Sequence, residues 1–179
     1  MSAVALTGTP GTGKSTVAAR LGSGLRVLEV HEFARQAKTG RLREGTWTVD
    51  VAATSRAWRS TRRPPAEVVV GHLAHLLPIR DTIVLRCHPR ELARRLARAR
   101  RGTPREKNEN LVAEATDVIL LEAIGRGRRI WEVDTTGRSV DSVARDVRRR
   151  IRRRGPPSYG KVDWLSDRWV SEHLLDWSP

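Results

Sequence analysis

Short apolar runs alternate along the chain with longer stretches in which apolar residues recur every three or four positions. The runs are rich in β-branched and aliphatic residues and predict strands at residues 3–6, 25–30, 67–70, 82–86 and 129–134. Two of them, Glu67-Val-Val-Val70 and Thr82-Ile-Val-Leu-Arg86, hold consecutive apolar residues. This pattern is typical of parallel strands that are buried on both faces.

Helical periodicity fills the stretches between these runs. One face of a helix after the first strand is marked by Val17, Ala18 and Leu21. Similar patterns predict helices at residues 31–38, 49–62, 89–101, 109–124 and 139–153, and the polar segment 39–45 predicts a loop. Five strands with interleaved helices predict an α/β fold, a five-stranded parallel sheet with helices on both faces. Ligands of such sheets bind at the carboxyl ends of the strands.

The first strand leads into the stretch Gly8-Thr-Pro-Gly-Thr-Gly-Lys-Ser-Thr16, which has the spacing of a P-loop. Its glycines permit backbone conformations that a side chain would forbid, so that successive amide groups point at one anion beside the next helix. Lys14 is expected to reach the β- and γ-phosphates of a nucleotide, and Ser15 to bind Mg²⁺. The sequence therefore predicts a P-loop NTPase fold.

Length and composition limit the remaining possibilities. A chain of 179 residues with 39% hydrophobic content predicts one domain with a real core and no room for a second catalytic domain. It shows neither a run of 18 apolar residues nor a charged-then-apolar leader. We therefore expect a cytoplasmic protein that is neither secreted nor membrane-spanning. Its one cysteine, Cys87, allows no internal disulfide.

The charge of the chain is strongly positive. Lysine and arginine number 34 against 20 aspartate and glutamate residues, a formal net charge of +14, and arginine supplies most of the positive charge. Such a surface attracts phosphate-rich partners, nucleotide or RNA. A general arginine bias of the genome explains the same composition, and the charge alone does not separate the two explanations.

The segments between the predicted elements distinguish among P-loop proteins. The chain lacks the Asn-Lys-x-Asp motif with which a small GTPase reads guanine, and a motor or AAA-type ATPase would be longer. A nucleoside monophosphate kinase needs a P-loop, an insertion that holds the acceptor nucleotide and an arginine-bearing lid. Phosphoryl transfer is catalysed mainly by positioning and charge neutralisation, for which lid arginines are suited. The length and layout favour this third class.

Several segments resemble the atypical adenylate kinases of archaea and the eukaryotic nucleus, a family also tied to assembly of the small ribosomal subunit. The resemblance runs nearly end to end. It rests on the P-loop, Val68-Val-Val-Gly-His-Leu-Ala-His-Leu-Leu-Pro78, Leu85-Arg86 with Pro89-x-x-Leu92-x-x-Arg95-Leu96, Arg101-Gly102 with Glu109-Asn110-Leu-x-x-Glu114, Glu132-Val-Asp134-Thr135 and Gly160-Lys-Val-Asp-Trp164. The Gly-His-Leu and Glu-Asn-Leu stretches are more specific than the P-loop.

The resemblance implies a kinase-like domain at residues 1–155, with an NMP-binding segment at about 29–49 and a lid at about 100–110. Residues 156–179 would form a C-terminal extension that packs on the core. The implied ligands of ATP phosphates and Mg²⁺ are Gly11, Gly13, Lys14, Ser15 and Thr16. His72 would lie near the γ-phosphate, Arg101 would contact phosphate from the lid, and Arg138 would line the adenine pocket.

One position departs from the family pattern. The family usually carries a carboxylate after the third strand that orders Mg²⁺ through water, but Val70 stands here. The nearest acidic groups are expected to be Glu67, at the wrong end of the strand, and Asp81, one strand later. Magnesium would then depend on Ser15 and the phosphates, and turnover would be slow.

Two function classes stay open. The first is a kinase that catalyses ATP + AMP ⇌ 2 ADP, with ATP hydrolysis as an accompanying activity. The second is an ATPase switch in small-subunit assembly and rRNA maturation, with a ribosomal protein or pre-rRNA as partner. Each of these assignments has an alternative. His72 would be an ordinary histidine at a strand end, and Arg101 would belong to a solvated, arginine-rich helix face. The C-terminal extension would bind another protein or rRNA and not pack on the core.

Overall fold

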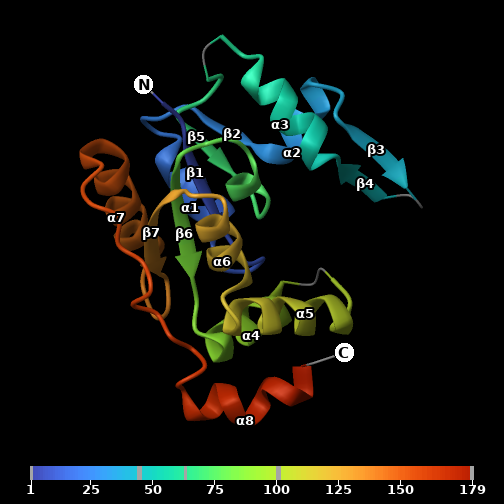
Figure 1. Ribbon diagram of the computed structural model, residues 1–179. Coiled ribbons are helices and arrows are strands. Elements are labelled where there is room, and N and C mark those ends of the chain that lie inside the picture. The colour runs from blue at the N-terminus through green and yellow to red at the C-terminus, as the bar shows by residue number, and fades with distance from the viewer. Residues whose placement is uncertain (1, 44–45, 63, 100–101, 178–179) are drawn as a thin grey trace.

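The computed structural model describes residues 2–43, 46–62, 64–99 and 102–177 (Figure 1). Its centre is a five-stranded parallel sheet. The strands are, in spatial order, β2 (Val27–Glu29), β5 (Val68–Val70), β1 (Val4–Gly8), β6 (Asp81–Arg86) and β7 (Arg129–Asp134). The predicted fold class is confirmed, since all five predicted strands form and every pairing is parallel.

Helices cover both faces of the sheet because successive strand residues point to opposite sides. Val4 and Leu6 of β1 pack on one side with α1 (Lys14–Leu21) and α7 (Val140–Arg153). Ala3 and Ala5 face the other side, where the packed elements are α2 (Val30–Gln36), α3 (Val51–Arg59) and the 3₁₀ turn η1 (Ala74–Leu76). The helix α6 (Val118–Gly125) covers β6 and β7 on this second side.

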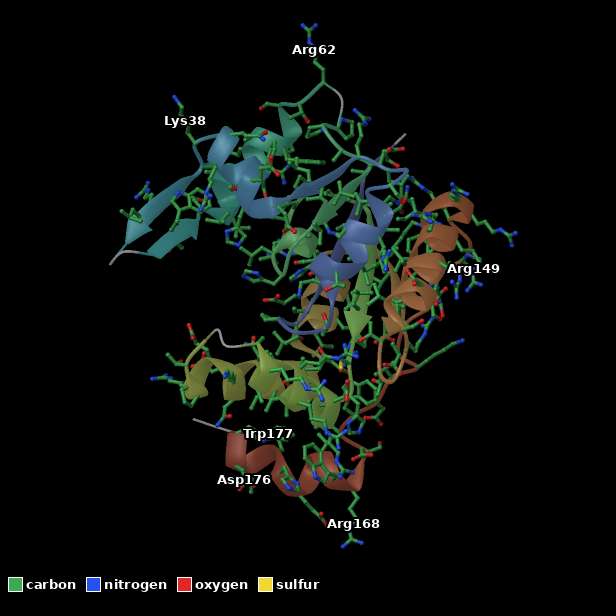
Figure 2. The ribbon with its side chains drawn as sticks, turned by 180° about the vertical axis from the view of Figure 1, so that it is seen from behind. Lys38, Arg62, Arg149, Arg168, Asp176 and Trp177 are labelled. Atoms are coloured by element: carbon green, nitrogen blue, oxygen red, sulfur yellow. The ribbon has the colours of Figure 1, made fainter. Side chains whose placement is uncertain are left out.

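A further layer lies beyond the carboxyl end of β6 (Figure 1). It consists of α4 (Pro89–Arg98), α5 (Pro104–Ala115) and α8 (Arg168–Trp177), whose apolar residues form a separate cluster around Leu92, Leu111 and Val170. Figure 2 shows Trp177 on the side of α8 that faces α4 and α5. Within the described part of the chain, no helix is long and apolar enough to cross a membrane.

The segment predicted as a polar loop and helix start is instead a β-hairpin. Its strands are β3 (Gly40–Arg43) and β4 (Thr46–Val49), paired antiparallel with Leu42 opposite Trp47. Leu42 between two arginines, and Trp47 between two threonines, do alternate with polar residues, but each strand has only four residues, too few for the alternation to stand out in the sequence. Helix α3 consequently begins at Val51, after Asp50, whose carboxylate caps it by accepting from the Ala53 amide at 2.8 Å.

The helix predicted at residues 109–124 is two helices, α5 and α6. They are separated by Asp117, whose φ of 59° is left-handed and cannot continue a helix. Helix α5 also begins earlier than predicted, at Pro104, because Thr103 before it and Glu106 in its first turn form a capping box. Residues 104–110 of the expected lid are therefore its first turns.

Candidate active site

The P-loop joins β1 to α1 in a conformation that glycine makes possible. Gly8 has a φ of 141°, and a Cβ there would lie 2.3 Å from the carbonyl oxygen of Leu85 on the neighbouring strand. Gly13, with a φ of 97°, precedes the first residue of α1, which is Lys14. The amides of the first helical turn have no carbonyl partner within the helix, so they are available to an anion.

A cleft of about 1390 Å³ opens over this loop. The P-loop residues Gly11, Gly13, Lys14, Ser15 and Thr16 all line it. Its other walls come from the carboxyl ends of β2 and β5, from α4, α5 and α6, and from the turn between β7 and α7. The cleft therefore lies at the carboxyl ends of the strands, where parallel sheets bind ligands.

Lys14 lines the cleft and is only 9% exposed. Its Nζ donates to the carbonyl oxygen of Thr9 at 2.9 Å, within the same loop. Burial lowers the pKa of Lys14 to about 8, and the negative charges of Glu114 and Glu29 oppose this shift. Lys14 is thus mostly protonated at neutral pH, with its ammonium group held beside the loop that would receive phosphates.

His72 lies two residues after the end of β5 and lines the cleft. The residue keeps part of its surface exposed, but partial burial of the ring and, second, the positive charge of Lys14 lower the pKa of His72 to about 4. Its ring centroid lies 5.6 Å from that of His31, and the His31 ring lies 6.0 Å from the Trp47 ring in the hairpin. At neutral pH His72 is a neutral group that can donate one hydrogen bond and accept another.

A second histidine of the same stretch, His75, is buried and structural. Its Nδ1 lies 3.0 Å from the Thr7 hydroxyl on β1, and its Nε2 lies 2.7 Å from a carboxylate oxygen of Glu122 on α6. Burial lowers the pKa of His75. This histidine therefore ties α6 to the strand that carries the P-loop.

An acidic residue stands close to the position of Val70 after all. Glu29 ends β2 and is the register partner of Val70 in the adjacent strand β5. It lines the cleft, burial raises its pKa, and its charge acts on Lys14. The expectation that Glu67 and Asp81 are the nearest acids is therefore wrong. Asp81 is the first residue of β6, so it lies at the amino ends of the strands, and it pairs there with Arg129 and Arg154.

Of the two arginines predicted to bind the nucleotide, the structure describes only Arg138. Arg138 lines the cleft, and its guanidinium is held by the Asp134 carbonyl at 2.9 Å and the Ser142 hydroxyl at 3.2 Å. Arg101 lies outside the described residues. Arg95 was given no role of its own from the sequence. It also lines the cleft, and it donates to the hydroxyl and carbonyl of Thr135 at 3.1 and 3.0 Å.

The donor set of the cleft fits Mg²⁺. Ser15 supplies a hydroxyl at the first turn of α1, and Glu29 a carboxylate in the same cleft. Magnesium is usually held by one or two protein groups together with substrate phosphates and water. No group of three or more histidine, cysteine or acidic side chains that could hold a metal ion occurs among residues 2–43, 46–62, 64–99 and 102–177.

The sequence reasoning also missed the support of the P-loop by Glu114. This carboxylate on α5 accepts from the Thr9 hydroxyl at 2.5 Å. Glu114 belonged to a quoted motif, but its partner is more than 100 positions away, and only the fold brings them together. Lys107 and Asn110 of α5 face the cleft as well.

Comparison with known proteins shows which proteins this chain resembles. A family model described as "AAA domain" matches residues 4–117. A solved gluconokinase from Sinorhizobium meliloti superposes with a TM-score of 0.51 at 18% identity, covering 85% of this chain and 92% of that one, and shows the fold alone.

Closer relatives come from archaea. A protein of Archaeoglobus fulgidus is 40% identical over 174 residues, 92% of each chain, and one of Thermococcus kodakarensis is 37% identical over 164 residues, 90% of this chain and 92% of that one. Both are named "Putative adenylate kinase". The P-loop, the cleft above it and these relatives agree, and the chain belongs to this archaeal family of P-loop nucleotide kinases.

Proposed function

We propose that the protein is an adenylate kinase, which transfers the γ-phosphate of ATP to AMP and hydrolyses ATP as an accompanying activity. The size and lining of the cleft carry the proposal. Sites for one small ligand measure roughly 300–1,000 Å³, whereas this cleft has about 1390 Å³. It extends from the P-loop both to His31 beside the hairpin and to α5, which leaves room for a donor and an acceptor nucleotide.

The donor side would be the P-loop. Gly11, Gly13 and Thr16 would offer backbone amides to the ATP phosphates, and Lys14 would leave the Thr9 carbonyl to contact the β- and γ-phosphates. Arg138, fixed by the Asp134 carbonyl, would form the edge of the adenine pocket. Mg²⁺, held by Ser15 and through water by Glu29, would neutralise charge on the phosphates.

The acceptor side would be the NMP-binding segment, residues 29–49. His31 and Trp47 contact each other there, and the guanidinium of Arg35 lies 5.2 Å from the Trp47 ring centroid. Aromatic and cationic groups of this kind suit a nucleotide with a base and one phosphate. We assign AMP to this side, supported by the name of the archaeal relatives.

His72 lies between the two sides. Because its pKa is lowered to about 4, it would act as a neutral hydrogen-bonding group toward the transferred phosphoryl group and not as a cation. Arg95, Lys107 and the lid residue Arg101 would supply the positive charge that neutralises the equatorial oxygens. Closure of the lid segment, about 100–110, would exclude the water that otherwise hydrolyses ATP.

Product analysis tests this proposal. Purified protein is incubated with ATP and Mg²⁺, with and without AMP, and ADP and phosphate are measured separately. AMP is expected to raise ADP formation without a matching rise in phosphate, and Lys14→Ala is expected to abolish the reaction. Phosphate release that AMP does not change would overturn the kinase assignment.

A second candidate function is an ATPase switch in assembly of the small ribosomal subunit. The observation that favours it is the arginine-rich surface of α7, lined by Arg145, Arg148, Arg149, Arg152 and Arg153, which adjoins Arg138 at the edge of the cleft. Figure 2 shows Arg149 directed away from the core. Such a surface suits the phosphates of pre-rRNA, and a small-subunit ribosomal protein would be the second partner of this switch.

The same assay separates this candidate from the kinase. The switch predicts phosphate release that is insensitive to AMP and stimulated by RNA. Stimulation should fall when Arg148, Arg149 and Arg152 are replaced together by glutamine, because the surface loses positive charge while the P-loop is unchanged. RNA without effect on phosphate release would count against the switch.

A further inference from the structure

Glu114 is a buried carboxylate, 2% exposed, that joins three distant parts of the chain. Its Oε2 accepts from the hydroxyl of Thr9 in the P-loop at 2.5 Å. Its Oε1 accepts from the Arg86 Nε at 2.9 Å, the Cys87 amide at 3.0 Å and the indole Nε1 of Trp164 at 3.2 Å. One oxygen therefore faces the nucleotide loop, and the other faces the sheet and the C-terminal segment.

Thr9 links Glu114 to Lys14, the proposed phosphate-binding lysine. While its hydroxyl is held by Glu114, its carbonyl oxygen accepts from the Lys14 Nζ at 2.9 Å and from the Thr12 hydroxyl at 2.9 Å. The position of the Thr9 backbone therefore sets where the Lys14 ammonium group rests. A displacement of Glu114 would change the P-loop without touching a residue of the loop itself.

The C-terminal segment is anchored on both sides of Trp164. Before it, Ser158 exchanges backbone hydrogen bonds with Ile130 and Glu132 of β7, both at 2.9 Å. The Glu132 carboxylate accepts from the Gly160 amide and from Arg86, which also binds Glu114. After it, Val170 of α8 is fully buried in the apolar cluster with α4 and α5. These anchors fix the indole relative to Glu114.

Helix α5 lies between the cleft and this segment. Lys107 and Asn110 on one side line the cleft, and Leu111 and Ala115 on the other side pack in the cluster that contains α8. The ribbon shows α8 below α4 and α5, on the side away from the sheet (Figure 1). The C-terminal segment thus supports the element that carries Glu114 as well as the carboxylate itself.

We propose that the C-terminal segment, residues 158–177, positions the nucleotide-binding loop through Trp164, Glu114 and Thr9. Trp164 is a positioning residue: its indole N–H orients the Glu114 carboxylate so that the other oxygen holds the Thr9 hydroxyl. This inference rests on the proposed function in one respect, namely that the P-loop binds ATP.

The test compares Trp164→Phe with Trp169→Phe. Trp169 belongs to the same apolar cluster, so its replacement removes a similar bulk without removing a hydrogen bond to Glu114. Unfolding midpoints and the dissociation constant for ATP are measured for both variants. We expect similar midpoints, but ATP binding about fivefold or more weaker in Trp164→Phe alone. Equal weakening in both variants would overturn the proposal, because Trp164 would then be only a packing residue.

Thr9→Val provides an independent arm that leaves the C-terminal segment intact. It removes the hydroxyl that donates to Glu114 and should weaken ATP binding by a similar factor. Adding Trp164→Phe to Thr9→Val should then have little further effect, because both act through one contact. Unchanged binding in Thr9→Val, or strictly additive effects, would refute the coupling. A wild-type protein that binds no ATP would instead refute the proposed function.

Discussion

Glu29 and Val70 are register partners in the β2–β5 pair, so a carboxylate stands beside the end of β5, two residues before His72. The side chain of Glu29 lines the cleft and acts electrostatically on Lys14. A carboxylate on either of two neighbouring parallel strands reaches the same edge of the sheet, because the strands end together. The acid for Mg²⁺ can therefore come from β2.

This placement predicts that Glu29→Gln raises the Mg²⁺ concentration needed for ATP binding and turnover. The amide keeps the size of the side chain but loses the negative charge that attracts hydrated Mg²⁺. We expect about a tenfold rise in the half-saturating Mg²⁺ concentration, measured both by turnover and by Mg²⁺-dependent binding of ATP. Glu67→Gln is the matched control, since Glu67 precedes β5 at the amino end of the strand, away from the cleft, and accepts from the Arg26 amide. Equal responses of the two variants would argue against a role for Glu29 in metal binding.

Lys14→Ala is expected to lose turnover without losing the fold. Loss of a charge that acts on the transferred phosphoryl group should lower kcat by about 10²-fold or more. Stability should be kept or raised, because burial lowers the pKa of Lys14 from its unfolded value of 10.5 to about 8, and a buried ammonium therefore opposes folding at neutral pH. Steady-state kinetics and urea unfolding of the same preparations measure both effects. Undiminished turnover would contradict the P-loop assignment, and Lys161→Ala, an exposed lysine elsewhere, is the control.

Features set by residues close together in the sequence could be predicted, whereas contacts between residues distant in the sequence could not. The P-loop and the strands were predictable because glycine spacing and β-branched runs act over a few residues. Glu29 was missed because its neighbour Val70 is distant in sequence, and only the order β2-β5-β1 makes the two adjacent. The contact between Thr9 and Glu114 was missed for the same reason.

Local chemistry explains the remaining differences. The hairpin at residues 40–49 was hidden because each of its strands has only four residues, so the alternation around Leu42 and Trp47 is too short to distinguish from a polar loop. The break between α5 and α6 was hidden because the apolar period continues from Leu111 to Ile119 across Asp117. The left-handed backbone conformation of Asp117 interrupts the helix, and the spacing of apolar residues gives no information about a single backbone angle.

His72 is expected to make stability depend on pH between about 6.5 and 4. Its folded pKa of about 4 lies below the unfolded value of 6.5, so the unfolded state binds a proton first as the pH falls. Its contribution to stability is complete above pH 6.5 and is lost as the pH falls toward 4. Urea unfolding at several pH values should show a smaller pH dependence in His72→Gln than in wild type. Because His75 shifts in the same direction, NMR titration of the His72 ring in wild type is needed for assignment. A ring that titrates near 6.5 would contradict the prediction.

In catalysis, His72→Ala should lower kcat while leaving the dissociation constant for ATP nearly unchanged. His72 lines the cleft beyond the P-loop, and no hydrogen bond of its ring to the loop occurs among the described residues, so phosphate binding does not require it. Single-turnover kinetics and equilibrium binding of ATP separate the two quantities. Loss of ATP binding with an intact turnover constant would instead identify His72 as a structural residue of the cleft.

Arg86→Met is expected to be the most destabilising of these substitutions. The Arg86 guanidinium is 2% exposed and pairs with Glu114 at 2.9 Å, Glu132 at 2.7 Å and also Asp117. Removing it leaves two buried carboxylates without their cation, which costs about 3–5 kcal/mol of the free energy of unfolding. Urea unfolding of Arg86→Met and of Arg90→Met, whose parent arginine is exposed on α4, gives the comparison. A loss of less than about 1 kcal/mol in Arg86→Met would mean that water reaches the carboxylates. Because Glu114 also holds Thr9, the surviving folded protein should bind ATP more weakly, whereas Arg90→Met should bind it as wild type does.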